Sequence, residues 1–220
     1  MCRILSIRVV IAGAVDADRP LLVVGNHFGV IDPLILASQL EISFVGKAEL
    51  RRWPLVGWVT RQVGVIFVER ERHGRVNDFL TVVRERLDRG IPVMVFPEGT
   101  TSPDETVLPF KTGAFEAVTG RLSAAVLPVY LRPVRVNGRP AVGTTRGLVT
   151  WAGGNQSFVE HLFQLVNLES AEVEIRIGEA ILAGQMERKE LARKAHAAVV
   201  ALAHESRRRR KGHFSTERRT

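Results

Sequence analysis

The sequence predicts a single α/β domain in which helices flank a largely parallel or mixed sheet. Short runs rich in apolar and β-branched residues, such as 21–25 and 91–96, are typical of buried strands. Other segments, such as 75–89, carry apolar residues at helical spacing. Because strands and helices alternate over 220 residues, one layered domain is the expected architecture.

The first half of the chain supplies four of the expected strands. Residues 4–12 are β-rich, and 21–25 form a continuous apolar run. Asp32 suits the N-cap of a helix at 33–40, because Pro33 fits the first helical position. Strands are expected next at 42–46 and 64–68, on either side of a helix at 49–61 that Pro54 interrupts.

The second half repeats the alternation. A helix at 75–89 is expected to end at Gly90, and a strand at 91–96 follows it. A helix at 112–121, a strand at 125–131 and a β-rich stretch come next, and Pro128 indicates a sheet edge or a bend. The last helix is expected at 187–205. We therefore expect a domain at 1–205 and a basic, disordered tail at 206–220.

The positive charge of the chain is concentrated in that tail. Residues 207–220 hold seven basic residues against one acid, which is +6 of the formal net charge of +8. A polybasic segment of this kind can bind anionic lipid headgroups at about 1 kcal/mol per cation. We expect contact with an anionic membrane surface, and no nucleic acid, through a cluster of five residues: Arg207, Arg208, Arg209, Arg210 and Lys211.

The expected location is the cytoplasm, on the inner face of the cell membrane. Cys2 is the only cysteine, so an intrachain disulfide is impossible and a reducing compartment is the simplest. No apolar run reaches the ~18–20 residues that span a bilayer. A protein that acts on membrane lipid would then lie on the surface.

The sharpest local feature is the segment 26–32, Asn-His-Phe-Gly-Val-Ile-Asp, which follows a buried strand. Ligands of open α/β sheets bind at the carboxyl ends of strands. On a regular helix His27 and Asp32 would point about 140° apart, so they can meet only if the chain turns, and Gly29 permits a turn. A carboxylate on one imidazole nitrogen would prepare the other to take a proton. The alternative is that Asp32 only caps a helix.

Three further blocks could contribute to a site. Residues 96–102, Phe-Pro-Glu-Gly-Thr-Thr-Ser, leave a buried strand with a carboxylate and three hydroxyls. Residues 64–70 end in Glu69 and Arg70, and an arginine there could clamp a phosphate or carboxylate. Residues 126–129 contain a proline in an apolar strand. Taken alone, each block could also be an ordinary turn, surface ion pair or bend.

In their order and spacing, these four blocks resemble the four motifs of the glycerolipid acyltransferases, the family that contains bacterial lysophosphatidate acyltransferase. The segment 110–114, Phe-Lys-Thr-Gly-Ala, is also similar to a family element. The resemblance covers residues 20–132 well. It implies a phospholipid-biosynthesis enzyme, a 1-acyl-sn-glycerol-3-phosphate O-acyltransferase-like protein, that moves a fatty acyl group from acyl-ACP or acyl-CoA to the free hydroxyl of a lysophospholipid.

The resemblance also implies the roles of site residues. His27 would be the general base for the acceptor hydroxyl, and Asp32 would orient it. Acceptor binding would fall to a second set: Asn26, Arg70, Glu98, Gly99, Thr100, Thr101 and Lys111. No enzyme nucleophile, metal or cofactor is required, because the thioester donor is itself a substrate. The partners are then a lysolipid and a thioester of acyl carrier protein or coenzyme A.

Two departures from the family pattern bear on the acceptor. Gly29 replaces a frequent Ser, and Thr101 replaces a frequent Arg that is usually assigned to phosphate contact. Lysophosphatidate, which would give phosphatidic acid, is the first expectation. Lyso-ornithine lipid is the alternative, because the segment 98–111 is similar to the branch that acylates it. A non-catalytic lipid-binding protein is a further alternative. Histidines outside these blocks, His161 among them, are expected at the surface.

Overall fold

A computed structural model describes residues 6–15, 18–47, 65–68, 76–102, 104–151 and 157–217. Its strands are β1 (Ile7–Ala12), β2 (Leu21–Gly25), β3 (Ser43–Lys47), β4 (Ile66–Val68), β5 (Val93–Val95), β6 (Ala125–Val136), β7 (Arg139–Pro140), β8 (Ala171–Ile177) and β9 (Ile181–Leu182). The helices are α1 (Asp32–Ala37), α3 (Val76–Asp88), α4 (Gly143–Gly147), α5 (Phe158–Val166) and α6 (Arg188–Glu217), with a 3₁₀ turn η2 at Gly113–Ala117.

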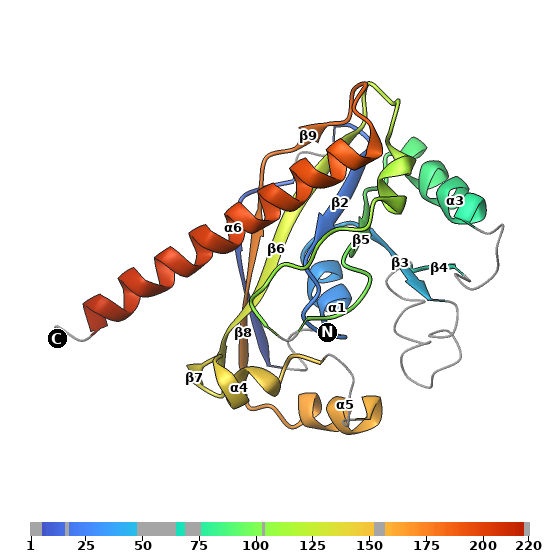
Figure 1. Ribbon diagram of the computed structural model, residues 1–220. Helices are drawn as coiled ribbons and strands as arrows, with labels where there is room; N and C mark the ends of the chain where they lie inside the picture. Colours follow the sequence, from blue (N-terminus) through green and yellow to red (C-terminus); the bar gives the residue numbers. More distant parts are fainter. Residues whose placement is uncertain are drawn as a thin grey trace.

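The strands form one mixed sheet, as the sequence predicts. Its order is β1-β8-β6-β2-β5-β3-β4, and β7 and β9 add to β6. The pairs on both sides of β2 are parallel, whereas β6 and β8 pair antiparallel. Figure 1 shows the long helix α6 crossing one face of this sheet, with α4, α5 and β7 gathered at one end.

The sheet separates two apolar layers. Alternate residues of β2 point to opposite faces, so that Leu21 and Val23 join one layer while Leu22 and Val24 join the other. The first layer is closed by α1 and by residues around α5. The second is closed by α3, η2 and α6. All five residues of β2 are buried, which explains why their sequence is apolar without alternation.

Several predicted boundaries are wrong. The helix expected at 112–121 is a single 3₁₀ turn at Gly113–Ala117, and the β-rich stretch after 131 contains the helices α4 and α5. The helix expected to end near 205 runs on to Glu217, so the backbone of the basic segment is helical that far. Its first residues also pack on the body, since the Ser206 hydroxyl donates to Glu174. The predicted helix at 49–61 lies outside the described residues.

Pro128 lies in an inner strand. The sheet edge, one of the two positions predicted from this proline, is therefore wrong. On one side β6 pairs with β2, and on the other it pairs with β9 up to Val126 and with β8 from Val129. Pro128 therefore occupies the point where one neighbour gives way to the next, and its missing N–H interrupts no ladder bond there. Its carbonyl still accepts the N–H of Gly178 at 2.9 Å.

Within the described residues, the structure contains no helix that combines the length and the apolar character needed to span a bilayer.

Candidate active site

His27 leaves the carboxyl end of β2 and is fixed at its backbone on both sides. Its N–H donates to Oε2 of Glu98 at 3.0 Å, and its carbonyl accepts the N–H of Ser102 at 2.7 Å. The imidazole ring stacks on Phe96, with ring centroids 4.1 Å apart and planes 13° apart. The residues after β5 thus hold the histidine that follows β2, because these two parallel strands are neighbours.

The predicted pair of His27 and Asp32 is present. Nδ1 of His27 lies 2.7 Å from Oδ2 of Asp32, and the same oxygen accepts the N–H groups of Phe28 at 2.7 Å and Gly29 at 3.1 Å. Since backbone N–H groups can only donate, Oδ2 is an acceptor, and His27 carries its proton on Nδ1. Nε2 is then the basic nitrogen of this ring, and no described residue hydrogen-bonds to it.

Asp32 meets His27 by a different local geometry from the predicted N-cap. Ile31 is the N-cap of α1, and Asp32 is the first residue of this helix. The side chain of Asp32 has no exposed surface. The chain turns before the helix, where the N–H of Asp32 donates to the carbonyl of Gly29 at 3.3 Å. Burial raises the pKa of Asp32, and the hydrogen bonds from His27, Gly29 and Phe28 offset part of that rise.

The missing side chain of Gly29 matters more for close packing than for the turn before α1. Its φ is not among the positive values of the chain, so any residue could adopt this backbone. A Cβ built on Gly29, however, would lie 3.0 Å from the carbonyl oxygen of Val149 and 3.5 Å from the nitrogen of Trp151. The glycine therefore lets the segment 149–151 pass against the segment 27–32, and the N–H of Trp151 donates to the carbonyl of Phe28 at 3.1 Å.

The side chain of Glu98 is buried and helps to hold His27 in place. It is 4% exposed, and its second oxygen, Oε1, accepts the N–H of Leu108 at 2.8 Å. Both carboxylate oxygens are thus occupied by backbone donors, which makes Glu98 a positioning group for His27. Burial raises the pKa of Glu98 to about 7, although the hydrogen bonds from Leu108 and His27 act in the opposite direction.

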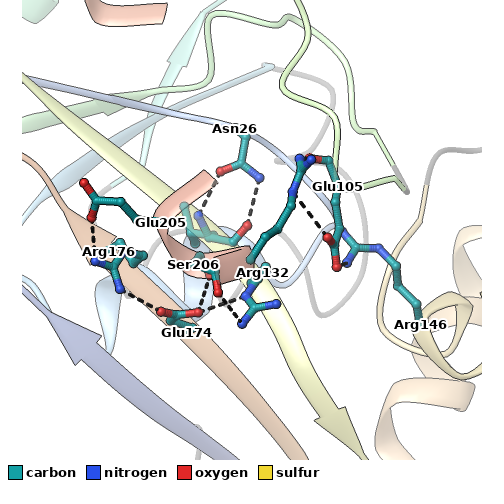
Figure 2. Close-up of polar contacts among 10 residues, drawn as sticks. Asn26, Glu105, Arg132, Arg146, Glu174, Arg176, Glu205 and Ser206 are labelled. Atoms are coloured by element: carbon teal, nitrogen blue, oxygen red, sulfur yellow. Dashed lines mark hydrogen bonds and ion pairs between the residues drawn. The ribbon is translucent and has the colours of Figure 1, made fainter. Parts of the chain in front are cut away.

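Asn26 is also committed to the scaffold. Its Nδ2 donates to the carbonyl of Leu131 at 2.9 Å, and its Oδ1 accepts the N–H of Leu131 at 2.8 Å (Figure 2). The amide therefore joins the residue that follows β2 to the middle of β6. Its predicted contact with substrate stays a prediction.

Three of the remaining predicted site residues directly follow Glu98, and Lys111 packs against the first of them. Gly99 has φ +73°, and a Cβ there would come within 2.6 Å of Nζ of Lys111, so the lysine side chain lies directly over the glycine. Thr100 is exposed and Thr101 is half-buried. Arg70 lies outside the described residues. Among the described residues, no cluster of three His, Cys, Asp or Glu side chains is placed to hold a metal ion.

Sequence reasoning missed a partly buried ionic cluster that braces the site loop 98–108. Glu105 in this loop pairs with Arg146 of α4 at 3.4 Å and with Arg207 of α6 at 3.5 Å. Arg146 also donates to the carbonyl of Asp104 at 3.1 Å. The loop that holds His27 is therefore tied to two distant helices. These residues carry no motif spacing, so only their charge marks them in the sequence.

A neighbouring cluster ties α6 to the sheet. Glu174 of β8 accepts from Arg132 at 2.8 Å, from Arg176 at 3.1 Å and from the hydroxyl of Ser206 (Figure 2). Arg176 also donates to Glu205 at 2.8 Å. Burial by itself would raise the pKa of Glu174, but the hydrogen bonds from Ser206, Arg132 and Arg176 lower it overall.

The geometry leaves one ring nitrogen of His27 without a hydrogen-bond partner among the described residues. Nε2 of His27 belongs to a ring that is 20% exposed, so a substrate hydroxyl can reach it. Within the described part of the chain, no serine or cysteine side chain hydrogen-bonds to His27. The arrangement therefore suits proton removal from a hydroxyl group of a bound substrate.

Comparisons with known proteins agree with this chemistry. The family model described as Acyltransferase matches residues 6–134, which include His27, Asp32 and Glu98. The lyso-ornithine lipid O-acyltransferase of Brucella abortus (strain 2308) is 34% identical over 209 residues, which is 92% of this chain and 78% of that protein. The 1-acyl-sn-glycerol-3-phosphate acyltransferase of Neisseria gonorrhoeae is 33% identical over 54% of this chain and 46% of its own.

A solved structure extends the similarity to the fold. The crystal structure of the 1-acyl-sn-glycerophosphate acyltransferase from Thermotoga maritima aligns with a TM-score of 0.65 and 27% sequence identity. The alignment covers 92% of this chain and 73% of that one.

Proposed function

This chain belongs to the acyltransferase family, and we propose that it transfers a fatty acyl group from a thioester to the free hydroxyl of a lysolipid. The observation that carries the proposal is the 2.7 Å contact between Nδ1 of His27 and Oδ2 of Asp32. It leaves Nε2 as the base, in a family whose members move acyl groups. The lipid-binding alternative has no use for such a pair.

In the proposed reaction, Nε2 of His27 takes the proton of the acceptor hydroxyl while the oxygen attacks the thioester carbonyl carbon. A C–O bond forms and the C–S bond breaks, and the proton passes from Nε2 to the leaving thiolate. The negative charge of Asp32 stabilises the imidazolium that exists between these two proton transfers. Glu98 and Ser102 fix the backbone of His27 and Phe96 stacks on its ring, so that the reacting atoms stay aligned.

For the acceptor we propose a lyso-ornithine lipid, with lysophosphatidate as the second candidate. Thr101 is half-buried at the rim of the site and carries no charge, whereas a phosphate monoester favours a guanidinium. An ornithine headgroup offers one carboxylate and one ammonium, so it demands less positive charge. Lyso-ornithine lipid O-acyltransferases also match most of this chain, as the relatives from Brucella abortus and Pseudomonas aeruginosa do at 92% and 90%.

Lysophosphatidate remains a candidate because of one position in the site. Lys111 lies over Gly99 and can contribute a positive charge to a phosphate. The Thermotoga maritima structure, which aligns over 92% of this chain, is of an enzyme named for that acceptor.

The donor and the location are further parts of the proposal. A thioester of acyl carrier protein or of coenzyme A would donate the acyl group, and no other cofactor is needed. We place the enzyme at the inner face of the cell membrane, where exposed arginines such as Arg208 and Arg209 can reach anionic headgroups.

A competition assay tests the proposal. Purified protein receives an acyl-thioester with equimolar lysophosphatidate and lyso-ornithine lipid, and mass spectrometry identifies the product. Ornithine lipid as the main product supports the first candidate, and phosphatidate supports the second. The variant His27→Ala should lower turnover by about 100-fold or more with either acceptor. A folded His27→Ala protein with near-normal turnover would refute the proposed mechanism.

A further inference from the structure

Helix α5 exposes large apolar side chains on its outer face. Val159, Phe163 and Val166 are 59%, 67% and 60% exposed. At ~100° per residue the spacing of four and three positions places them within about 60° of one another around the helix. We call these three residues the α5 face. The opposite side of α5 is also apolar, because Leu165 and His161 are buried at 2% and 0% exposure.

Helix α5 is held in place, so the exposure of these three side chains does not come from fraying of the helix. A capping box fixes its first turn, in which Ser157 and Glu160 exchange side-chain to backbone hydrogen bonds. The ring of His161 stacks on Trp151 with centroids 6.3 Å apart, which corrects the prediction that this histidine lies at the surface. Leu165 belongs to the apolar layer beneath the sheet. The α5 face is therefore a fixed feature of the surface.

The α5 face lies at the active-site end of the molecule. Trp151, on which His161 stacks, donates its N–H to the carbonyl of Phe28, the residue next to His27. Figure 1 shows α5 beside α4, at the end of the sheet toward which β2 and β6 run. A surface that touched the α5 face would thus also lie near the base that acts on the acceptor.

Positive charge borders the same end. The exposed Arg139 belongs to the β6–β7 hairpin, whose turn residue Asn137 accepts the N–H groups of Glu169 and Ser170 just after α5. Arg146 of α4 pairs with Glu105, which also pairs with Arg207, where the basic part of α6 begins. The exposed apolar side chains of α5 match the apolar part of a lipid leaflet, and the exposed Arg139 can contact its headgroups.

We propose that the α5 face is the membrane-docking surface of this enzyme. Val159, Phe163 and Val166 enter the boundary between headgroups and acyl chains, while Arg139 contacts a lipid phosphate. The inference rests on the proposed function, because a lysolipid acceptor is itself held in a bilayer. Docking through α5 brings His27 to the surface from which the acceptor hydroxyl is presented.

The test is vesicle binding by the full chain. Sedimentation with vesicles of phosphatidylcholine and phosphatidylglycerol gives a partition coefficient for the wild type and for the double variant Val159→Ser, Phe163→Ser. The double variant should bind about tenfold to 100-fold more weakly, because two exposed apolar side chains are lost from the lipid contact. The matched control is Leu122→Ser, which removes an apolar side chain that is 71% exposed but lies before β6, outside the α5 face. The control should bind like the wild type.

A second measurement separates docking from chemistry. With a short-chain acceptor dissolved below its critical micelle concentration, the double variant should turn over like the wild type and lose activity only on vesicles. Equal vesicle binding by wild type and double variant would overturn the inference, and so would a dimer of the wild type that the double substitution dissociates. Absence of turnover by the wild type on every acceptor would instead refute the proposed function and leave the binding result standing.

Discussion

Replacing Asp32 by Asn tests the central pair with little change in shape. The amide keeps one oxygen that can accept the N–H groups of Phe28 and Gly29, so the turn before α1 can persist. What is lost is the negative charge beside the imidazolium that forms during proton transfer. Nδ1 and Oδ2 are 2.7 Å apart, which puts the charge centres at about 4 Å. At an effective dielectric constant of about 20 their attraction is about 4 kcal/mol.

An energy of that size corresponds to a loss of about 10³-fold in kcat. The assay is steady-state turnover, with thermal unfolding measured alongside it. The variant should remain folded, because burial raises the pKa of Asp32 and the native state therefore gains little from the charge itself. The control is Asp78→Asn, which changes an exposed acid in the first turn of α3 and should leave kcat unchanged. A folded Asp32→Asn protein with kcat within tenfold of the wild type would refute the reasoning.

Three further predictions concern the support of the site and its rim. The pKa of Glu98 is raised from 4.5 to about 7, so the free energy of unfolding should fall by about 3 kcal/mol as pH rises through this range, and Glu98→Gln should remove that decline in urea titrations. Arg146→Met should lower kcat about tenfold by loosening the loop that holds His27. Thr101→Arg should shift the competition assay toward lysophosphatidate by about tenfold, since a guanidinium can bind its phosphate bidentately.

Each of these has a contrary outcome. An unchanged pH dependence in Glu98→Gln would mean that another group titrates. Arg176→Met serves as the control for Arg146→Met, because Arg176 ties α6 to β8 without touching the loop and should change only stability. Equal kcat losses in these two variants would remove the special role of the loop brace. No change in acceptor preference would show that position 101 does not contact the headgroup.

The predictions that held depend on local sequence. The strand at 21–25 is apolar throughout because both of its faces are covered. The contacting side chains of His27 and Asp32 follow it within seven residues. The helix α5 was missed although Ser157 and Glu160 spell a capping box, since the apolar residues around it read equally well as strand. The end of α6 was misplaced because a run of arginines has good helix propensity but suggests a solvated tail.

The sequence by itself determined the strand–helix alternation, the contact between His27 and Asp32, and the family. These features depend on residue type and on the spacing of residues that are close in the sequence, and both can be read directly from the sequence. Only the tertiary structure decided that Asn26 and Glu98 bind backbone groups, that Gly29 makes room for the segment 149–151, and that Arg146 and Arg207 brace the site loop. Such contacts join residues up to about a hundred positions apart, and a hydrogen-bond partner at that separation is chosen by the packing of the sheet.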